Sequence, residues 1–267
     1  MLAVITGASS GLGVAFARKL AARGYDLLLI ARREDRLRAL AREIGDQYKV
    51  RAEALAADLT DDAALAAVAA RVRDAVDLGL LVNNAGFGIL GYFFEADAEG
   101  QERMHRLHVL ATLRLSHAAL ANLVPRAAAG TGVINVSSVA AYGASPQNAS
   151  YCSTKAWMNR FTESVSLDLL VRRSPVTVQA LCPGFIMTEF HDTLSMDRSK
   201  IPASMWMNAD FVVEESLRGF ASGELFVIPG WRYKLIVRFL QLLPGSWLRR
   251  GSIGLARRYR QPKQGVK

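Results

Sequence analysis

Three residues of this chain could together move a proton: Ser138, Tyr151 and Lys155. Ser138 ends an apolar run that begins at Gly132, and the pair Tyr-x-x-x-Lys opens the next helical segment. Residues four apart share one face of a helix, so we expect the Lys155 ammonium beside the Tyr151 phenol. A nearby cation lowers a phenol pKa that is ordinarily about 10. The pattern predicts a tyrosine general acid or base, with the Ser138 hydroxyl holding a substrate oxygen.

A glycine-rich turn near the start of the chain is a second chemical signal. The apolar stretch from Leu2 to Thr6 runs into Gly7-Ala-Ser-Ser-Gly11-Leu-Gly13, and a helical pattern follows directly. Glycines at a strand–turn–helix junction let the backbone approach a pyrophosphate and let the helix pack closely on its strand. The turn predicts a nucleotide-phosphate site; the alternative is a structural turn without a ligand.

Together these motifs resemble the short-chain dehydrogenase/reductase family. The matching residues are Thr6-Gly-x-x-x-Gly-x-Gly13, Asp58-Leu59, Asn83-Asn84-Ala85-Gly86, Asn135-Val-Ser-Ser138, Tyr151-x-x-x-Lys155 and Pro183-Gly184-x-x-x-Thr188. They stand in family order at family spacing and cover about residues 1–190. The resemblance implies an α/β fold: a doubly wound, mostly parallel Rossmann sheet of about seven strands with helices on both faces. It also implies hydride transfer between NAD(H) or NADP(H) and a carbonyl or alcohol.

The resemblance assigns further roles, residue by residue. Tyr151 would be the general acid or base, Ser138 would fix the substrate oxygen, and Lys155 would also bind the nicotinamide ribose. Asp58 matches the residue that contacts adenine, and Thr188 lies in the segment that holds the nicotinamide amide. The implied cofactor-binding residues are Gly7, Ser9, Ser10, Gly11, Leu12, Gly13, Arg32, Arg33, Asp58, Leu59, Asn84, Ala85, Gly86, Tyr151, Lys155, Pro183, Gly184, Ile186 and Thr188.

The end of the second expected strand bears on cofactor choice. An NAD enzyme of this fold usually places an acid there to bind the ribose 2′-hydroxyl. Here that position is Ala31, and Arg32 and Arg33 follow it. A guanidinium can pair with a 2′-phosphate, so we expect NADP(H) rather than NAD(H). The alternative is a solvated helix start in which these arginines pair with Glu34 and Asp35.

One position departs from the family pattern. Family members commonly carry an asparagine in the helix after the Asn-Asn-Ala-Gly turn, where it helps hold a water linking the active-site lysine to solvent. The corresponding residue here is His108. It could sustain that proton route and titrate at about pH 6–7, displace the water and slow turnover, or have no chemical role. We include His108 among the candidate catalytic residues.

Strands and helices are expected to alternate, which is typical of a parallel sheet with helical crossovers. Strands are expected near residues 2–6, 26–31, 50–56, 79–83, 132–137, 176–181 and 224–228, and helices near 11–23, 33–45, 61–76, 99–125, 151–172 and 210–220. A chain of 267 residues can form one large α/β domain. We assign 1–230 to that domain, with a substrate-covering segment at about 186–209, and 231–267 to a basic, partly helical extension.

The substrate itself is only weakly indicated. Candidate lining residues are Val139, Ala140, Tyr142, Phe185, Phe190, Met205 and Trp206. They would suit an apolar ketone or aldehyde; the alternative is ordinary core packing beneath a loop. Besides a reductase, two functions stay open: a non-catalytic NADP(H)-binding regulator on the same fold, and a scaffold that interacts through its tail. The resemblance also implies a homo-oligomer, a dimer or tetramer built through the helices beside the active site.

The positive charge of the chain is concentrated at its C-terminal end. Residues 225–267 contain ten Lys or Arg and no Asp or Glu, whereas the rest of the chain holds 23 basic and 24 acidic residues. The formal net charge of +9 therefore belongs almost wholly to the tail. No recognition motif accompanies it, which argues against nucleic-acid binding. Residues 231–243 are apolar with interspersed cations, so they could lie on an anionic membrane or pack on the domain or a second subunit.

Other features concern the compartment. We expect no export signal, because the chain opens directly on a strand, and no uncharged apolar run reaches the roughly 18 residues that span a bilayer. The two cysteines, Cys152 and Cys182, favour a reducing compartment, so a cytoplasmic location is expected, with possible peripheral contact to a membrane. Cys152 is interpreted as a packing residue, with a reactive thiol as the alternative. The other histidines form no ligand cluster, so no metal site is expected.

Overall fold

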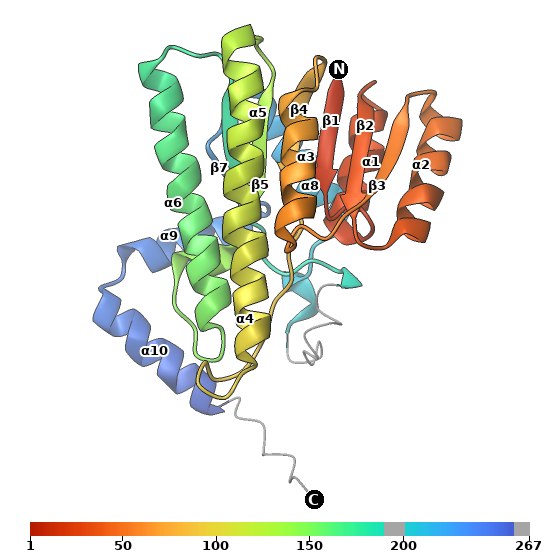
Figure 1. Cartoon of the computed structure of the whole chain (residues 1–267). Helices are drawn as coiled ribbons and strands as arrows, with labels where there is room; N and C mark the ends of the chain where they lie inside the picture. The colour runs from red at the N-terminus through yellow and green to blue at the C-terminus, as the bar shows by residue number, and fades with distance from the viewer. Residues whose placement is uncertain (190–200, 259–267) are drawn as a thin grey trace, which may run out of the picture.

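A parallel sheet of seven strands forms the centre of this single-domain molecule (Figure 1). The computed structural model describes residues 1–189 and 201–258. The strands are β1 (Leu2–Thr6), β2 (Asp26–Ala31), β3 (Ala52–Ala56), β4 (Leu78–Asn83), β5 (Gly132–Val136), β6 (Thr177–Leu181) and β7 (Phe226–Val227). Their order is β3-β2-β1-β4-β5-β6-β7, which confirms the doubly wound Rossmann sheet. Strand order reverses between β1 and β4, and ligands of such sheets bind at the strand ends there.

Helices cover both faces of the sheet (Figure 1). One face packs against α1 (Gly11–Ala21), α2 (Glu34–Tyr48) and α8 (Ala209–Ala221). The other face packs against α3 (Asp62–Arg73), α5 (Thr112–Arg126) and α6 (Ala149–Val171). Each strand and helix expected from the sequence is observed, and its ends lie within three residues of the expected ends.

The central strands are apolar at consecutive positions because both of their faces are covered. Side chains alternate between the faces, so Ile5 and Leu29 pack under α1 and α2, whereas Val4 and Leu28 pack on the opposite side. Each of these four side chains is no more than 1% exposed. The short apolar runs in the sequence are therefore buried strands of a three-layer α/β domain.

The expected helix over 99–125 is continuous but not uniform. It consists of α4 (Ala98–His105), a π-helical stretch η1 (Arg106–Ala111) and α5. Residues 98–126 form the one described helix that is long and apolar enough to cross a bilayer, with a mean hydropathy of 1.2 over its best window. Since 44% of that window is buried and α5 packs on the sheet, the helix is part of the domain core.

Residues 231–258 pack on the domain and form two helices, α9 (Trp231–Leu242) and α10 (Gly245–Arg258). The Tyr233 hydroxyl accepts a hydrogen bond from the Phe185 amide at 2.9 Å and donates one to the Met205 carbonyl at 2.7 Å. A Cβ on Gly184 would lie 1.9 Å from the Tyr233 ring, so only glycine allows this close approach. Packing on the domain, one of the alternatives for the tail, is thus observed.

Candidate active site

The turn between β1 and α1 has the tight geometry that its glycines suggest. Gly7 has a φ of +66°, and a Cβ on Gly13 would lie 2.2 Å from the Gly7 carbonyl oxygen. The first turn of α1 therefore lies directly against the end of β1. Ser9, Ser10, Gly11 and Leu12 line the cavity described next, whereas Gly13 does not. The packing of α1 on β1 therefore requires glycine at position 13, whether or not a ligand binds.

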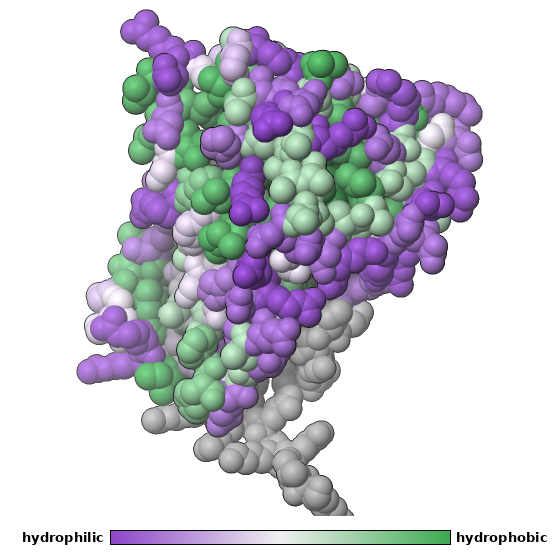
Figure 2. Space-filling model, in the orientation of Figure 1, coloured by the Kyte–Doolittle hydropathy of each residue, from purple (hydrophilic) through white to green (hydrophobic). Residues whose placement is uncertain are grey.

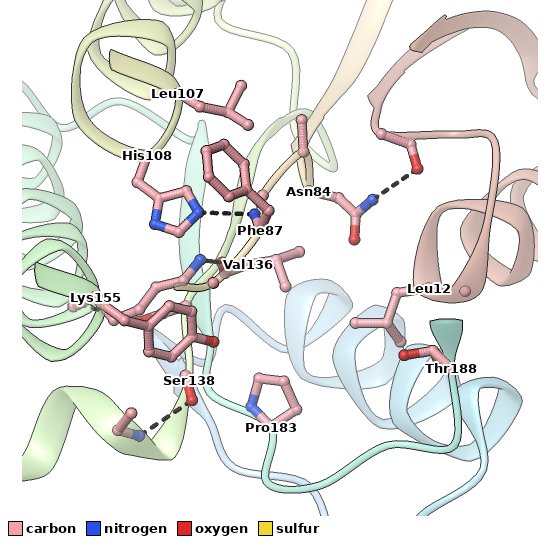
Figure 3. A pocket seen from close by; sticks show the side chains of 18 of the residues that line it. Leu12, Asn84, Phe87, Leu107, His108, Val136, Ser138, Lys155, Pro183 and Thr188 are labelled. Carbon is pink, nitrogen blue, oxygen red and sulfur yellow. Dashed lines mark hydrogen bonds between the residues drawn. The ribbon is translucent and has the colours of Figure 1, made fainter. Parts of the chain in front are cut away.

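One cavity of about 810 Å³ lies along the carboxyl ends of the strands (Figure 3). With the exception of Gly13, every residue assigned to catalysis or cofactor binding from the sequence lines it. These residues come from segments as far apart as Gly7 and Thr188. The parallel sheet brings them together because all its strands point their carboxyl ends to the same edge.

Ser138, Tyr151 and Lys155 meet at the inner part of this cavity. Figure 3 shows Ser138 and Lys155 close together there. The Ser138 hydroxyl oxygen accepts a hydrogen bond from the Ala140 amide at 3.1 Å, as the cap of the short 3₁₀ helix η2 (Val139–Tyr142). It also hydrogen-bonds with the Tyr151 phenol. Lys155 follows one turn later on α6, and its ammonium donates to the Val136 carbonyl at 2.7 Å. Backbone partners therefore orient both Ser138 and Lys155.

The pKa of Tyr151 differs from the sequence expectation. Although part of the side chain faces the cavity, desolvation by the surrounding protein raises the phenol pKa to about 12, opposed by the hydrogen bond with Ser138. Lys155 does not lower it as expected, because its Nζ lies 5.8 Å from the ring centroid over the face and is directed to a carbonyl. Burial also lowers the pKa of Lys155 to about 8. In this state the phenol is protonated at neutral pH, the form that donates a proton.

His108 is fully buried in η1, and its ring lies edge-on to that of Tyr151 with the centroids 5.9 Å apart. Its Nε2 accepts a hydrogen bond from the Phe87 amide at 3.2 Å, so a neutral ring carries its proton on Nδ1. That atom lies 3.0 Å from the Thr154 hydroxyl, which donates in turn to the Tyr151 carbonyl. Burial and the positive Lys155 hold the pKa of His108 well below 6.5. The geometry favours a neutral positioning residue over one that titrates at pH 6–7.

Asn84 and Thr6 connect the two strands at the switch point. The Thr6 hydroxyl accepts from the Asn84 and Ala85 amides, each at 3.0 Å. The Asn84 side chain, which points toward the glycine turn in Figure 3, donates to the carbonyls of Thr6 at 2.9 Å and Gly7 at 3.2 Å. These bonds hold the end of β4 against the glycine turn. They form the floor on which a dinucleotide would lie.

At the far end of the cavity, Arg33 has a partner that the sequence did not indicate. Its guanidinium pairs with Glu189 at 3.0 Å and donates to the Ser9 hydroxyl at 3.1 Å. Arg36 binds the same carboxylate at 2.7 Å. The alternative partner for Arg33, Glu34, pairs with Arg38 instead. Glu189 is 156 residues from Arg33, and no short motif marks such a pair.

Arg32 and Asp58 also line this end of the cavity. Burial tends to raise the pKa of the Asp58 carboxyl, but hydrogen bonds from Thr60 and the charge of Arg32 outweigh it and lower the pKa overall. Asp58 accepts from the Thr60 amide at 2.9 Å and the Thr60 hydroxyl at 2.8 Å. The carboxylate is therefore ionised and fixed beside an exposed guanidinium.

The expected substrate-lining residues divide into two groups. Val139, Ala140 and Phe185 line the cavity, whereas Met205 and Trp206 do not. Tyr142 does not line it either, because its hydroxyl is turned toward the Cys182 sulfur at 3.7 Å. Phe190 lies outside the described residues. The structure adds apolar or weakly polar lining residues from other segments: Phe87, Leu90, Leu107, Leu240 and Ser252. Leu240 and Ser252 come from α9 and α10, whose position no local sequence signal revealed.

Both cysteines are buried. Burial raises the pKa of the Cys152 thiol and raises that of Cys182 to about 11, so both stay protonated near neutral pH. A thiol in that state is a poor nucleophile, and the packing interpretation is favoured. Within residues 1–189 and 201–258, no group of three His, Cys, Asp or Glu side chains is placed to hold a metal ion.

Comparison with known proteins identifies the chain. A family model for short chain dehydrogenases matches residues 1–199. The chain belongs to the short-chain dehydrogenase family. Hydride-transfer oxidoreductases that bind NAD(P) are its relatives. This confirms the resemblance inferred from the motifs.

Two solved structures illustrate how far the similarity of this short-chain dehydrogenase extends. A short-chain dehydrogenase from Sphingobium yanoikuyae, solved in complex with NADPH, is 34% identical with a TM-score of 0.82, over 100% of this chain and 98% of that one. An alcohol dehydrogenase from Comamonas testosteroni, described as specific for bulky-bulky ketones, is 27% identical with a TM-score of 0.76, over 100% and 96%. Both comparisons include the C-terminal helices.

A third relative is described as inactive. The inactive hydroxysteroid dehydrogenase-like protein 1 of Homo sapiens is 28% identical over 188 residues, which are 70% of this chain and 56% of that protein. The dehydrogenase thus spans little more than half the length of that curated relative. Membership of the family alone does not establish turnover.

Proposed function

We propose that this short-chain dehydrogenase reduces an apolar ketone or aldehyde to an alcohol with NADPH. The observation that carries the proposal is the meeting of Ser138, Tyr151 and Lys155 at the inner end of the cavity. A protein that only bound a dinucleotide would have no need for a serine–phenol pair with a lysine one turn away. Apolar side chains on the same cavity, including Leu90 and Phe185, supply a surface for the rest of the substrate.

The residues divide the work of a carbonyl reduction. A bound nicotinamide supplies the hydride for the carbonyl carbon. The protonated Tyr151 phenol supplies the proton for the oxygen. Ser138 already accepts from the Ala140 amide, so its own hydroxyl proton can be directed at that oxygen. Lys155, held by the Val136 carbonyl, carries the positive charge that would hold the ribose of the bound nicotinamide nucleotide.

The proposed preference for NADP(H) rests on charge at the outer end of the cavity. Arg32 and Arg33 line it, both are exposed, and Ala31 provides no carboxylate to repel a 2′-phosphate. The Arg33 guanidinium already donates to Ser9, within the glycine turn, and pairs with Glu189. The NADPH complex of the Sphingobium relative supports this choice. The residues present fit the group: glycine backbone for the pyrophosphate and guanidinium groups for the phosphate.

An apolar carbonyl substrate is proposed for two reasons. The described residues lining the inner cavity are mainly apolar, and the Comamonas relative is specific for bulky ketones.

The proposal extends to a cytoplasmic homo-oligomer. Leu110 and Leu113 on the η1–α5 helix and Leu167 and Leu170 on α6 are 42, 42, 58 and 67% exposed. Burying such residues against a second copy would remove apolar surface from water.

The test is NADPH oxidation by purified protein across aldehydes, bulky ketones and long-chain oxo compounds, with Tyr151→Phe as the matched control. Turnover that disappears in the variant while NADPH binding persists supports the proposal. Turnover that survives in the variant contradicts the tyrosine assignment. Repeating the assay with NADH measures the cofactor preference separately from the chemistry.

The alternative is a non-catalytic NADP(H)-binding protein, which the similarity to an inactive relative favours. It predicts NADPH binding without turnover of any compound in the panel. A His108→Asn variant then separates two causes. If it turns over substrate, His108 had disabled the proton route; if it does not, the non-catalytic interpretation is supported.

A further inference from the structure

Helix α9 has two apolar faces, and only one of them is used by the fold. Tyr233 and Val237 are buried on the domain and Leu240 lines the cavity. On the other side, Trp231, Leu235, Phe239 and Leu242 are 64, 58, 62 and 76% exposed. At about 100° per residue these four fall within an arc of about 80°, turned away from the buried residues. The helix presents a continuous apolar stripe to the outside.

The stripe is part of a larger apolar rim near the mouth of the cavity. Helix α10 adds Trp247 and Ile253, which are 65 and 47% exposed. The Ser252 hydroxyl donates to the Ala144 carbonyl at 3.1 Å, which ties α10 to the loop before α6. The segment 90–94 joins the same loop, because the Gly91 amide bonds to the Gln147 carbonyl.

That segment adds its own exposed aromatic residues, Phe93 at 63% and Phe94 at 82%. Leu90 of the segment and Ser252 of α10 both line the cavity. Figure 2 shows hydrophobic residues gathered at the lower end of this view, over α10 and the chain that leads into α4. The exposed apolar surface therefore borders the cavity that a substrate would enter.

Charge indicates what would cover this face. Arg232, Lys234 and Arg238 flank the α9 stripe, all three are exposed, and Arg249 and Arg250 follow on α10. Residues 225–267 contain no acid. A two-fold contact through α9 and α10 of two copies would bring the like charges of these helices together. An anionic surface that accepts aromatic side chains between its charged groups is complementary on both counts.

We propose that the face formed by α9, α10 and segment 90–94 docks this dehydrogenase on an anionic membrane. Its cavity mouth then opens toward the lipid, and an apolar carbonyl substrate enters from the bilayer. The docking stands on surface chemistry alone. The entry of the substrate rests on the proposed function.

The experiment is co-sedimentation of the full chain with phosphatidylcholine vesicles, with and without phosphatidylglycerol, at low and high salt. We expect binding only to the vesicles that contain phosphatidylglycerol, weakened by salt. Phe239→Ser and Arg238→Glu should each weaken it by roughly tenfold, since each removes one of the two attractions. Val76→Ser, which removes an exposed apolar side chain just after α3, away from both this face and the proposed oligomer contact, should bind like the unaltered protein. NADPH binding and the thermal melting curve of each variant verify that it is folded.

Two results would overturn the docking. One is no binding to anionic vesicles, or binding that Phe239→Ser and Arg238→Glu leave unchanged. The other is an oligomer in sedimentation velocity that Phe239→Ser dissociates, which would show that a second copy covers the face. Vesicle binding without enzymatic turnover would keep the docking and remove the proposed function. Turnover without vesicle binding would keep the proposed function and remove the docking.

Discussion

The two ends of the same cavity are built on different principles. At the inner end, Lys155 and His108 are 5% and 0% exposed, and backbone groups hold both side chains. At the outer end, Arg33, Arg36 and Glu189 are each about half exposed and are held by one another. Charges at the inner end interact through protein, and those at the outer end interact through water.

This difference in solvent exposure determines how strongly a substitution at each end of the cavity should act. Desolvation moves the pKa values of Tyr151 and Lys155 to about 12 and about 8, whereas Arg33 and Arg36 pair at a surface where water screens them. Changes at the inner end should therefore alter rate, pH dependence and stability strongly. Changes at the outer end should adjust affinity. The following predictions test that contrast, beginning with the largest effect.

Tyr151→Phe removes the proton donor without changing the shape of the ring. We expect kcat to fall by roughly 10²- to 10⁴-fold, the usual effect of a positioned general acid, because the phenylalanine ring has no hydroxyl to supply the proton to the substrate oxygen. The dissociation constant for NADPH, measured by fluorescence titration, should change by less than about threefold. A comparable loss in NADPH affinity would show that the Tyr151 hydroxyl holds the cofactor rather than supplying the proton.

Lys155 is expected to produce an alkaline limb in the rate. Its folded pKa of about 8 means that it loses its charge as pH rises above that value, so NADPH-dependent reduction should fall up to about tenfold per pH unit. Lys155→Met should be slow and lack the limb, while the exposed Lys234→Met should keep it. A limb that survives in Lys155→Met belongs to another group.

The same shift has a consequence for stability with the opposite sign. The folded pKa lies below the ordinary value of 10.5, so between about pH 8 and 10.5 the unfolded chain binds more protons. The contribution of Lys155 to stability should rise with pH over that window. Urea unfolding of the unaltered protein and of Lys155→Met measures the difference.

His108 should make the protein sensitive to acid. Its folded pKa lies well below 6.5, so below that pH the unfolded chain takes up a proton that the native ring refuses, and stability falls as pH falls. The slope is at most about 1.4 kcal/mol per pH unit. In His108→Asn the slope should be smaller than in the unaltered protein. Equal slopes in the two proteins would mean that His108 is protonated in the fold.

The outer end should respond mildly and in opposite directions. Arg33→Ala should weaken NADPH binding by about tenfold and leave NADH binding unchanged, because only the former has a 2′-phosphate. Glu189→Gln should strengthen NADPH binding by about two- to fivefold, since it frees Arg33 from an exposed competing carboxylate. Weaker NADPH binding in Glu189→Gln would show instead that the carboxylate positions the arginine.

Much of the fold could be derived from local pattern. Ile5 and Leu29 belong to short apolar runs that end in turn residues, and such runs are buried strands whatever their neighbours are. The glycine turn could also be anticipated, because Gly7 and Gly13 are needed for backbone geometry within a few residues. The π-helical stretch that carries His108 could not, because periodicity alone does not show a single widened turn inside a long helix.

For the same reason, only part of the site could be predicted from the sequence. Ser138, Tyr151 and Lys155 stand in recognisable motifs, but Glu189, Leu240 and Ser252 reach the cavity only through long-range packing. Tyr142 could not be distinguished from true lining residues, since the turn of η2 directs its hydroxyl to Cys182.

The sequence by itself determined the order of strands and helices, the family, and which side chains could carry the chemistry. Those properties depend on residue type and spacing along the chain. The tertiary structure decided that burial, not Lys155, sets the pKa of Tyr151, that Glu189 is the partner of Arg33, and that α9 and α10 border the cavity. Desolvation and pairing depend on what surrounds a group in space, and residues distant in sequence supply those surroundings.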